Sequence, residues 1–335
     1  MNARLEAPPP LHRQLMQYDE MFGYRFVPGL KVRIPHEGGG YLVKTNAAGF
    51  RCNREATPQK NAAHRVLVFG DSYTAGDGVS NGKRYSDVLE EHLPDSEVLN
   101  FGLSGSGTDQ QYLIYREYAK KLDFDAVVIS VLVENITRNV VRHREWADRE
   151  GDALYVPKPW FDLADNGSIA LQGVPVPQPF HREDEVASAE SAGSLFSKAR
   201  KMVNGMGPEF KDKVQKLTRF QPLPEYDSPD SHAWKLLRAI LLHWVAEVKV
   251  PVMIAVLPVY QYVEKTASYS NVRKRFDELA IESGVPVHHF VDDLWQFSDE
   301  ERRNFRFRGD VHMTPPAHRV VGEAMAQHLR PLING

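Results

Sequence analysis

A serine that could act as a nucleophile is the first reactive group that this sequence suggests. The stretch Gly70-Asp71-Ser72 follows the short apolar run 66–69 and leads into glycines and small polar residues. A serine at the end of a buried strand lies where open α/β sheets place their reactive groups. Taken alone, the turn favours a simpler role, because Asp and Ser at turns usually satisfy backbone groups or cap a helix.

A histidine and an aspartate near the end of the chain could complete a catalytic set. Acyl transfer at a serine needs a base for the hydroxyl proton and a carboxylate that holds the base in one tautomer. His312 is the candidate base, and Asp310, two residues earlier, can reach its Nδ1. Capping of the next helix is one alternative, and a metal site with His318 is another. We expect no metal, because no further His, Asp or Glu cluster has ligand spacing.

Donors for a developing oxyanion follow three predicted strands. Gly105 lies in the glycine-rich turn 102–107 and offers a backbone N–H with no side chain to obstruct a carbonyl. Asn135 offers a side-chain amide just after the third strand, and the backbone N–H of Ser72 is a third donor. The glycines of this turn do not form G-x-G-x-x-G and do not follow the first strand, so they do not indicate a dinucleotide site.

The elements that must position these groups alternate between strands and helices. Short apolar runs predict strands at 66–69, 97–101, 126–133, 250–257 and 285–291. Amphipathic stretches predict helices at 85–93, 108–122, 233–247, 271–283 and 315–329. The alternation predicts a three-layer, doubly wound α/β fold with a five-stranded, mainly parallel sheet. In the flavodoxin-like strand order 2-1-3-4-5, the ends of strands one, two and three are neighbours, so the three donors converge.

Two regions fall outside this alternation. Residues 1–64 lack strong periodicity and predict an arm with short strands, packed on a main domain at 65–335. The segment from about 140 to 230 is an insertion, which either shapes a binding site or is a plain surface excursion. Within it, 158–177 predicts a hairpin that turns around Asn166-Gly167. Weakly periodic stretches predict helices at 185–202 and 210–220.

The composition is that of an ordinary globular protein. Of its 335 residues 42% are hydrophobic and 25% charged, and the net charge of −3 gives no case for nucleic-acid binding. A single cysteine excludes an intrachain disulfide. No run of about 18 apolar residues predicts a membrane span. The first residues lack the apolar region of a secretory signal, so we expect a cytoplasmic protein, with a truncated exported form as the alternative.

Four segments in this order resemble the SGNH/GDSL hydrolase superfamily, and bacterial GDSL-type esterases in particular. They are the Gly-Asp-Ser turn, the glycine turn after strand two, the asparagine after strand three, and the late Asp and His. The resemblance covers about 66–139 and 250–330, and extends to the entry segment 46–50 and the hairpin 158–177. It implies an SGNH-type hydrolase domain at 65–335.

The resemblance also implies a role for each candidate residue. Ser72 would be the nucleophile, with His312 and Asp310 as the rest of the triad. The oxyanion donors would be Ser72, Gly105 and Asn135. Asp71 would hold the turn. The third block departs from the common Gly-x-Asn-Asp pattern: residues 133–136 read Val-Glu-Asn-Ile, which keeps the asparagine and adds a glutamate that can bias substrate charge.

The implied reaction is hydrolysis of an ester or thioester, without cofactor or metal. We expect a small acyl or O-acetyl group on a small molecule or carbohydrate, and an acyl-enzyme intermediate. An acyltransferase using the same site, or an inactive binding protein of this fold, are the alternatives. The sequence does not indicate the oligomeric state. The aromatic and charged residues that would contact substrate, or else belong to the core, are Tyr73, Glu134, Trp160, Phe161, Tyr260 and Tyr262.

Overall fold

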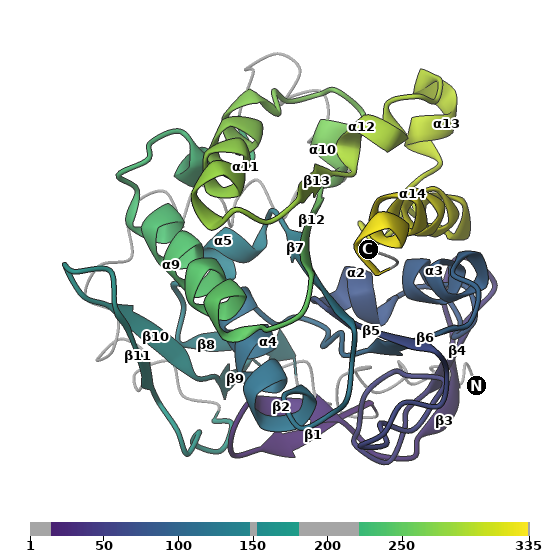
Figure 1. The fold of residues 1–335 in the computed structure, drawn as a ribbon, viewed down its shortest axis with the longest axis horizontal. Helices are drawn as coiled ribbons and strands as arrows, with labels where there is room; N and C mark the ends of the chain where they lie inside the picture. Colours follow the sequence, from purple (N-terminus) through teal and green to yellow (C-terminus); the bar gives the residue numbers. More distant parts are fainter. Residues whose placement is uncertain (1–14, 148–152, 181–220, 334–335) are drawn as a thin grey trace, which may run out of the picture.

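Five apolar segments pair side by side as parallel strands at the centre of the protein (Figure 1). The computed structural model describes residues 15–147, 153–180 and 221–333. The sheet order is β13-β12-β7-β5-β6, which in chain order is the predicted 2-1-3-4-5 arrangement. The strands are β5 (His64–Phe69), β6 (Ser96–Asn100), β7 (Ala126–Leu132), β12 (Val252–Leu257) and β13 (Val287–His289).

Alternate residues of each strand face two separate hydrophobic clusters. In β5, Leu67 and Phe69 join one cluster, and Val66 and Val68 join the other; all four side chains are fully buried. This is the burial expected of a parallel strand covered on both faces. Figure 1 shows α9 (His232–Glu247) and α11 (Ser270–Ser283) on one side of the sheet and α3 (Tyr85–His92) and α14 (Pro315–Ile333) on the other. The predicted three-layer fold is therefore confirmed.

The covering helices match the predicted amphipathic stretches within a few residues at most ends. Trp244 of α9 packs on the sheet, with its ring centroid 5.2 Å from that of Phe69. None of the described helices combines the length and apolar character needed to cross a membrane. The helices are α3 (Tyr85–His92), α4 (Thr108–Ile114), which continues as a π-helical turn over Tyr115–Ala119, α9 (His232–Glu247), α11 (Ser270–Ser283) and α14 (Pro315–Ile333).

The last strand is shorter than the sequence predicts. A strand was expected over 285–291, but β13 spans Val287–His289 and pairs only with β12, as an edge strand. The chain then enters the short helix α12 (Val291–Leu294). Two aspartates in its first turn, Asp292 and Asp293, favour a helix because their negative charges are attracted to the positive amino-terminal end of the helix dipole.

The insertion contains the predicted hairpin and one that was not predicted. Strands β10 (Trp160–Leu163) and β11 (Ile169–Gln172) pair antiparallel around the Asn166-Gly167 turn. Before them, β8 (His143–Ala147) and β9 (Ala153–Pro157) form a second antiparallel pair. The predicted helices at 185–202 and 210–220 lie outside the described residues.

The amino-terminal arm supplies aromatic side chains to the main hydrophobic cluster. Phe22, Tyr24 and Phe50 are at most 1% exposed, and Phe50 lies 5.0 Å from Phe101 of the core, centroid to centroid. The arm forms the hairpins β1 (Met16–Asp19) with β2 (Gly23–Phe26) and β3 (Lys31–Ile34) with β4 (Tyr41–Lys44). In addition, the buried Arg51 donates to Gly76 O (2.7 Å) and Val79 O (2.8 Å). The arm therefore braces the loop that follows the Gly-Asp-Ser turn.

A fully buried ion pair joins the insertion to helix α4. Lys158, between β9 and β10, donates to the carboxylate of Asp109 and to Pro159 O, and neither ionic side chain is exposed. Asp109 lies in the first turn of α4, directly after the glycine-rich turn. Because two buried charges compensate each other only as a pair, this contact fixes the insertion against the start of α4.

We expect Lys158→Met to lower the free energy of unfolding by about 3–5 kcal/mol, because it leaves the Asp109 carboxylate buried without its partner. The double variant Lys158→Met/Asp109→Leu should recover much of this loss. Urea unfolding followed by circular dichroism measures both variants. A single variant as stable as the wild type would contradict the prediction.

Candidate active site

Ser72 is the first residue of a short helix at the end of β5. The helix α2 (Ser72–Ala75) is capped by Asp71, whose Oδ1 accepts from the Tyr73 N–H at 3.0 Å. Gly70 is required at this turn, since a Cβ there would lie 1.8 Å from Thr74 Oγ1. Ser72 itself is 5% exposed, and its Oγ forms no hydrogen bond with the described residues. The serine hydroxyl is therefore free for chemistry.

Asp310 and His312 form the hydrogen bond that the sequence predicts. His312 Nδ1 lies 2.6 Å from Asp310 Oδ1, and the His312 backbone N–H donates to the same oxygen at 3.2 Å. A carboxylate can only accept, so Nδ1 carries the proton and Nε2 is left as the acceptor. This is the tautomer that a general base for a serine requires.

The loop that carries Asp310 and His312, the aspartate–histidine loop, packs against Tyr73, the residue after Ser72. The Tyr73 hydroxyl donates to Val311 O at 2.8 Å, and the Tyr73 ring centroid lies 5.5 Å from that of His312. Within the described residues, neither Ser72 Oγ nor His312 Nε2 has a hydrogen-bond partner. Hydrogen bonds between catalytic groups are often long when no substrate is bound. A hydrogen bond between Ser72 and His312 therefore stays a prediction.

The charges around His312 favour its protonated form. Burial is the largest effect and lowers its pKa, but the hydrogen bond to Asp310 and the negative charges of Asp77, Asp310 and Asp71 outweigh burial, so the pKa is raised. Burial would raise the pKa of Asp310, but the hydrogen bonds from His312 and His36 hold it well below its usual value. Asp310 is therefore ionised when His312 titrates.

The three predicted oxyanion donors lack acceptors within the described part of the chain. Gly105 has φ +77°, a left-handed conformation that suits glycine, and its N–H forms no hydrogen bond there. The Ser72 N–H is equally free at the start of α2. The Asn135 Nδ2 is buried and without a partner. An unpaired buried donor such as Asn135 Nδ2 is costly, and a charged oxygen bound at this place would satisfy it.

Arg138 is a site residue that the sequence analysis missed. It lies in α5 (Asn135–Arg138), and its Nη1 donates to Asp71 Oδ2 at 2.6 Å, to Asn135 Oδ1 at 3.2 Å and to Ser106 O at 3.3 Å. The guanidinium therefore contacts the loops that follow β5, β6 and β7. Because Asn135 Oδ1 accepts from Arg138, the amide nitrogen must point the other way, as a free donor.

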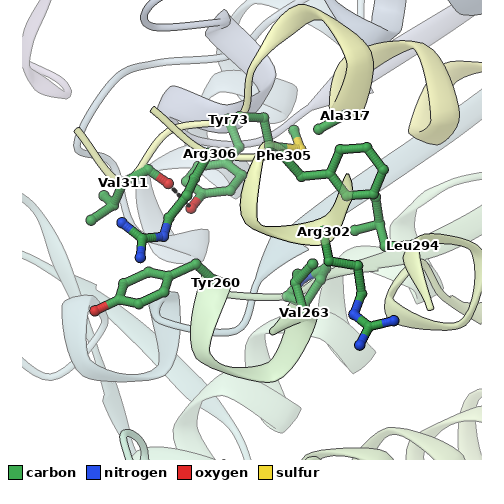
Figure 2. Close-up of a pocket in the computed structure, with 11 residues that line it drawn as sticks. Tyr73, Tyr260, Val263, Leu294, Arg302, Phe305, Arg306, Val311 and Ala317 are labelled. Atoms are coloured by element: carbon green, nitrogen blue, oxygen red, sulfur yellow. Dashed lines mark hydrogen bonds between the residues drawn. The ribbon is translucent and has the colours of Figure 1, made fainter. Parts of the chain in front are cut away.

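Of the six predicted substrate contacts, two line an apolar pocket and four do not. Tyr73 and Tyr260 line one apolar pocket, where the Arg306 guanidinium lies 4.2 Å from the Tyr260 ring centroid (Figure 2). Glu134 forms an ion pair with Arg138 at 3.1 Å. Trp160 does not line this pocket; it lies in β10, with the Arg142 guanidinium 4.8 Å from its ring centroid. The other two aromatic candidates, Phe161 and Tyr262, are core residues.

The position of His318 does not support a metal site formed with Asp310 and His312. His318 is buried in the core, and its Nδ1 accepts from the Tyr85 N–H at 3.1 Å. Among the described residues, the group whose ligand atoms do lie within 4.8 Å of one another is His288, Asp293 and His328. It lies at the edge strand β13, which β12 and β7 separate from β5, so it is not part of this site.

Comparisons with known proteins find similarity at the level of the fold. No family model matches the chain, and no curated protein matches it. Solved structures do match, among them a lipolytic G-D-S-L family protein from Veillonella parvula DSM 2008 (TM-score 0.41, 14% identity, 80% of this chain and 98% of that chain). Others are an inhibitor-bound M. smegmatis aryl esterase (0.39, 17%, 81% and 100%) and TesA (0.44, 12%, 80% and 99%).

The Veillonella protein and a further match, a putative lipolytic protein from Desulfitobacterium hafniense DCB-2, carry the G-D-S-L family name. At such identities and TM-scores the likeness says nothing about substrate or mechanism. The chemistry is therefore inferred from the side chains of this protein.

We expect Asp77→Asn to move the acidic limb of kcat/KM to lower pH, by less than about one unit. The change removes a charge that raises the pKa of His312, yet keeps an acceptor for the Ser104 hydroxyl, now 2.8 Å away. A histidine that acts as the base must be neutral to accept a proton, so we expect activity to fall as pH drops through the pKa of His312. The pH profile of ester hydrolysis measures the shift, with the surface variant Asp162→Asn as control; an unmoved limb would contradict it.

Proposed function

We propose that this protein is a serine hydrolase that cleaves a carboxylic ester with a small acyl group. The observation that carries the proposal is the set of free donors at Ser72, Gly105 and Asn135, which follow three neighbouring strands, together with the unpaired hydroxyl of Ser72. The buried amide donor of Asn135 has no partner of its own, and an oxyanion would supply the missing acceptor. The Asp310–His312 hydrogen bond supplies the base that the serine lacks on its own.

In the first half of the reaction, Ser72 Oγ attacks the ester carbonyl carbon, and the hydroxyl proton passes to His312 Nε2. The carbonyl oxygen becomes an oxyanion and accepts hydrogen bonds from the Ser72 and Gly105 N–H groups and from Asn135 Nδ2. His312 then gives its proton to the departing alkoxide, which leaves as an alcohol, and Asp310 stabilises the imidazolium in between.

In the second half, water replaces the alcohol. His312 Nε2 takes a proton from the water as its oxygen attacks the acyl-Ser72 carbonyl carbon. The same donors hold the second oxyanion. Collapse of this intermediate breaks the acyl–Ser72 bond, the serine oxygen regains its proton from His312, and the carboxylic acid leaves. Each step uses groups that this chain provides.

The apolar pocket beside the aspartate–histidine loop supports a small acyl group. Its lining includes Tyr73, which follows the nucleophile, and Val311 and Met313, which flank His312 (Figure 2). The pocket is narrow and mostly apolar, with room for about one or two waters, so it fits an acetyl-sized group.

We expect Ser72→Ala and His312→Ala each to lower kcat for p-nitrophenyl acetate on the order of 10³-fold or more, as loss of a nucleophile or base does. Ser168→Ala, at an exposed turn, is the matched control and should match the wild type. A serine-directed phosphonate should label the wild type at Ser72. Activity that survives Ser72→Ala would refute the proposal, and product analysis with added alcohols would reveal transfer in place of hydrolysis.

We expect Leu294→Ala to favour longer acyl chains, because Leu294 lines the pocket and is 2% exposed. The ratio of kcat/KM for p-nitrophenyl hexanoate to that for the acetate should rise roughly 10-fold, the lower end of what one or two methylenes in a pocket contribute. Leu163→Ala, in β10 and outside this pocket, serves as control. An unchanged ratio would place the acyl group elsewhere.

A further inference from the structure

The carboxylate of Asp310 has a second partner, which comes from the amino-terminal arm. His36 lies in the loop between β3 and β4, and its Nε2 is 3.2 Å from Asp310 Oδ2. The other carboxylate oxygen, Oδ1, is the one that contacts His312. The His36 side chain is 12% exposed, so this contact is largely shielded from solvent. The two oxygens of Asp310 thus face two different histidines.

The tautomer of His36 follows from its second contact. The Gly38 backbone N–H donates to His36 Nδ1 at 3.3 Å. An N–H group can only donate, so Nδ1 must be the acceptor and the proton of the neutral ring must lie on Nε2. His36 therefore donates to Asp310 Oδ2. This bond satisfies the oxygen that His312 leaves free and stabilises the ionised carboxylate.

Packing and backbone contacts hold the arm on the same loop. The His36 ring lies edge-on to Phe307 and Tyr41, with centroid distances of 4.4 and 5.6 Å. The neighbouring Glu37 accepts from the Arg308 and Gly309 N–H groups at 3.1 and 2.8 Å. A Cβ at Gly309 would lie 3.3 Å from Glu37 Oε1, which is tighter than an ordinary contact. The arm therefore binds the loop just before Asp310 as well as Asp310 itself.

We propose that His36 is a positioning residue of the proposed active site: it donates to Asp310 Oδ2 and so orients the carboxylate toward His312. This inference rests on the proposed serine hydrolase function. A loop carrying a general base gains from such a partner, because a displacement of about 1 Å can cost a reaction about 100-fold in rate. The competing explanation is that the His36 ring merely fills the space between Phe307 and Tyr41.

Two substitutions separate the donor from the ring. His36→Phe keeps an aromatic ring and removes the donor, whereas His36→Gln keeps an N–H donor and removes the ring. We expect His36→Phe to lower kcat for p-nitrophenyl acetate on the order of 10-fold with little change in KM, and His36→Gln to retain most of the activity. His92→Phe, at a well-exposed histidine, is the matched control.

The kinetic outcomes decide between the two explanations. If His36→Phe equals the wild type, His36 does not position the carboxylate. If His36→Gln loses as much kcat as His36→Phe, the ring matters and the donor does not, which also overturns the inference. Circular dichroism and thermal unfolding of each variant identify any loss that comes from misfolding.

A measurement without substrate tests the same contact. In protein labelled with ¹⁵N-histidine, NMR should show neutral His36 protonated at Nε2. It should also show a downfield Nδ1 proton of His312 that shifts in His36→Phe. His36 protonated at Nδ1, or an unmoved His312 resonance, would overturn the inference. Failure of the proposed function looks different: no ester is hydrolysed and the phosphonate does not label Ser72.

Discussion

The ion pair between Arg138 and Asp71 is the contact on which the geometry of the site depends. Its guanidinium lies 2.6 Å from a fully buried carboxylate, and it also contacts the turns after β6 and β7. Burial lowers the pKa of Arg138, but the charges of Asp71 and Glu134 outweigh it and raise the pKa. The guanidinium is therefore a permanent charge, and loss of Arg138 would leave the fully buried Asp71 carboxylate without its ionic partner.

Arg138 also compensates for a residue that the third block lacks, compared with the superfamily that the sequence resembles. The third block lacks the aspartate that commonly follows its asparagine, and Ile136 stands there instead. Arg138 stands three residues after Asn135, so the two side chains lie on the same face of α5. Arg138 Nη1 donates to Asn135 Oδ1 and so orients the amide. In this protein the guanidinium of Arg138 thus orients the Asn135 amide donor.

The sequence predicts those parts of the structure that depend on neighbouring residues. Apolar runs and turn residues locate the central strands, because strand burial and turn chemistry are local properties. The aspartate–histidine pair is recognisable because its members stand two residues apart. Arg138 and His36 were missed because their partners, Asp71 and Asp310, lie 67 and 274 residues away. A lone Arg or His carries no local signal for such contacts, although the Asn135–Arg138 spacing of one helical turn was visible.

The contacts between the amino-terminal arm and the aspartate–histidine loop affect the order in which parts of the protein can fold during synthesis. His36 emerges from the ribosome 274 residues ahead of Asp310. The arm can bury its aromatic rings against the first strands early, yet Glu37 and His36 find their partners only when the last loop has been made. Because the chain is made from its amino end, the contacts between the arm and Asp310 can form only after all five strands of the sheet have been synthesised. Since α14 follows that loop and covers one face of the sheet, a ribosome-bound fragment ending before the loop would lack both this cover and the Asp310–His312 pair.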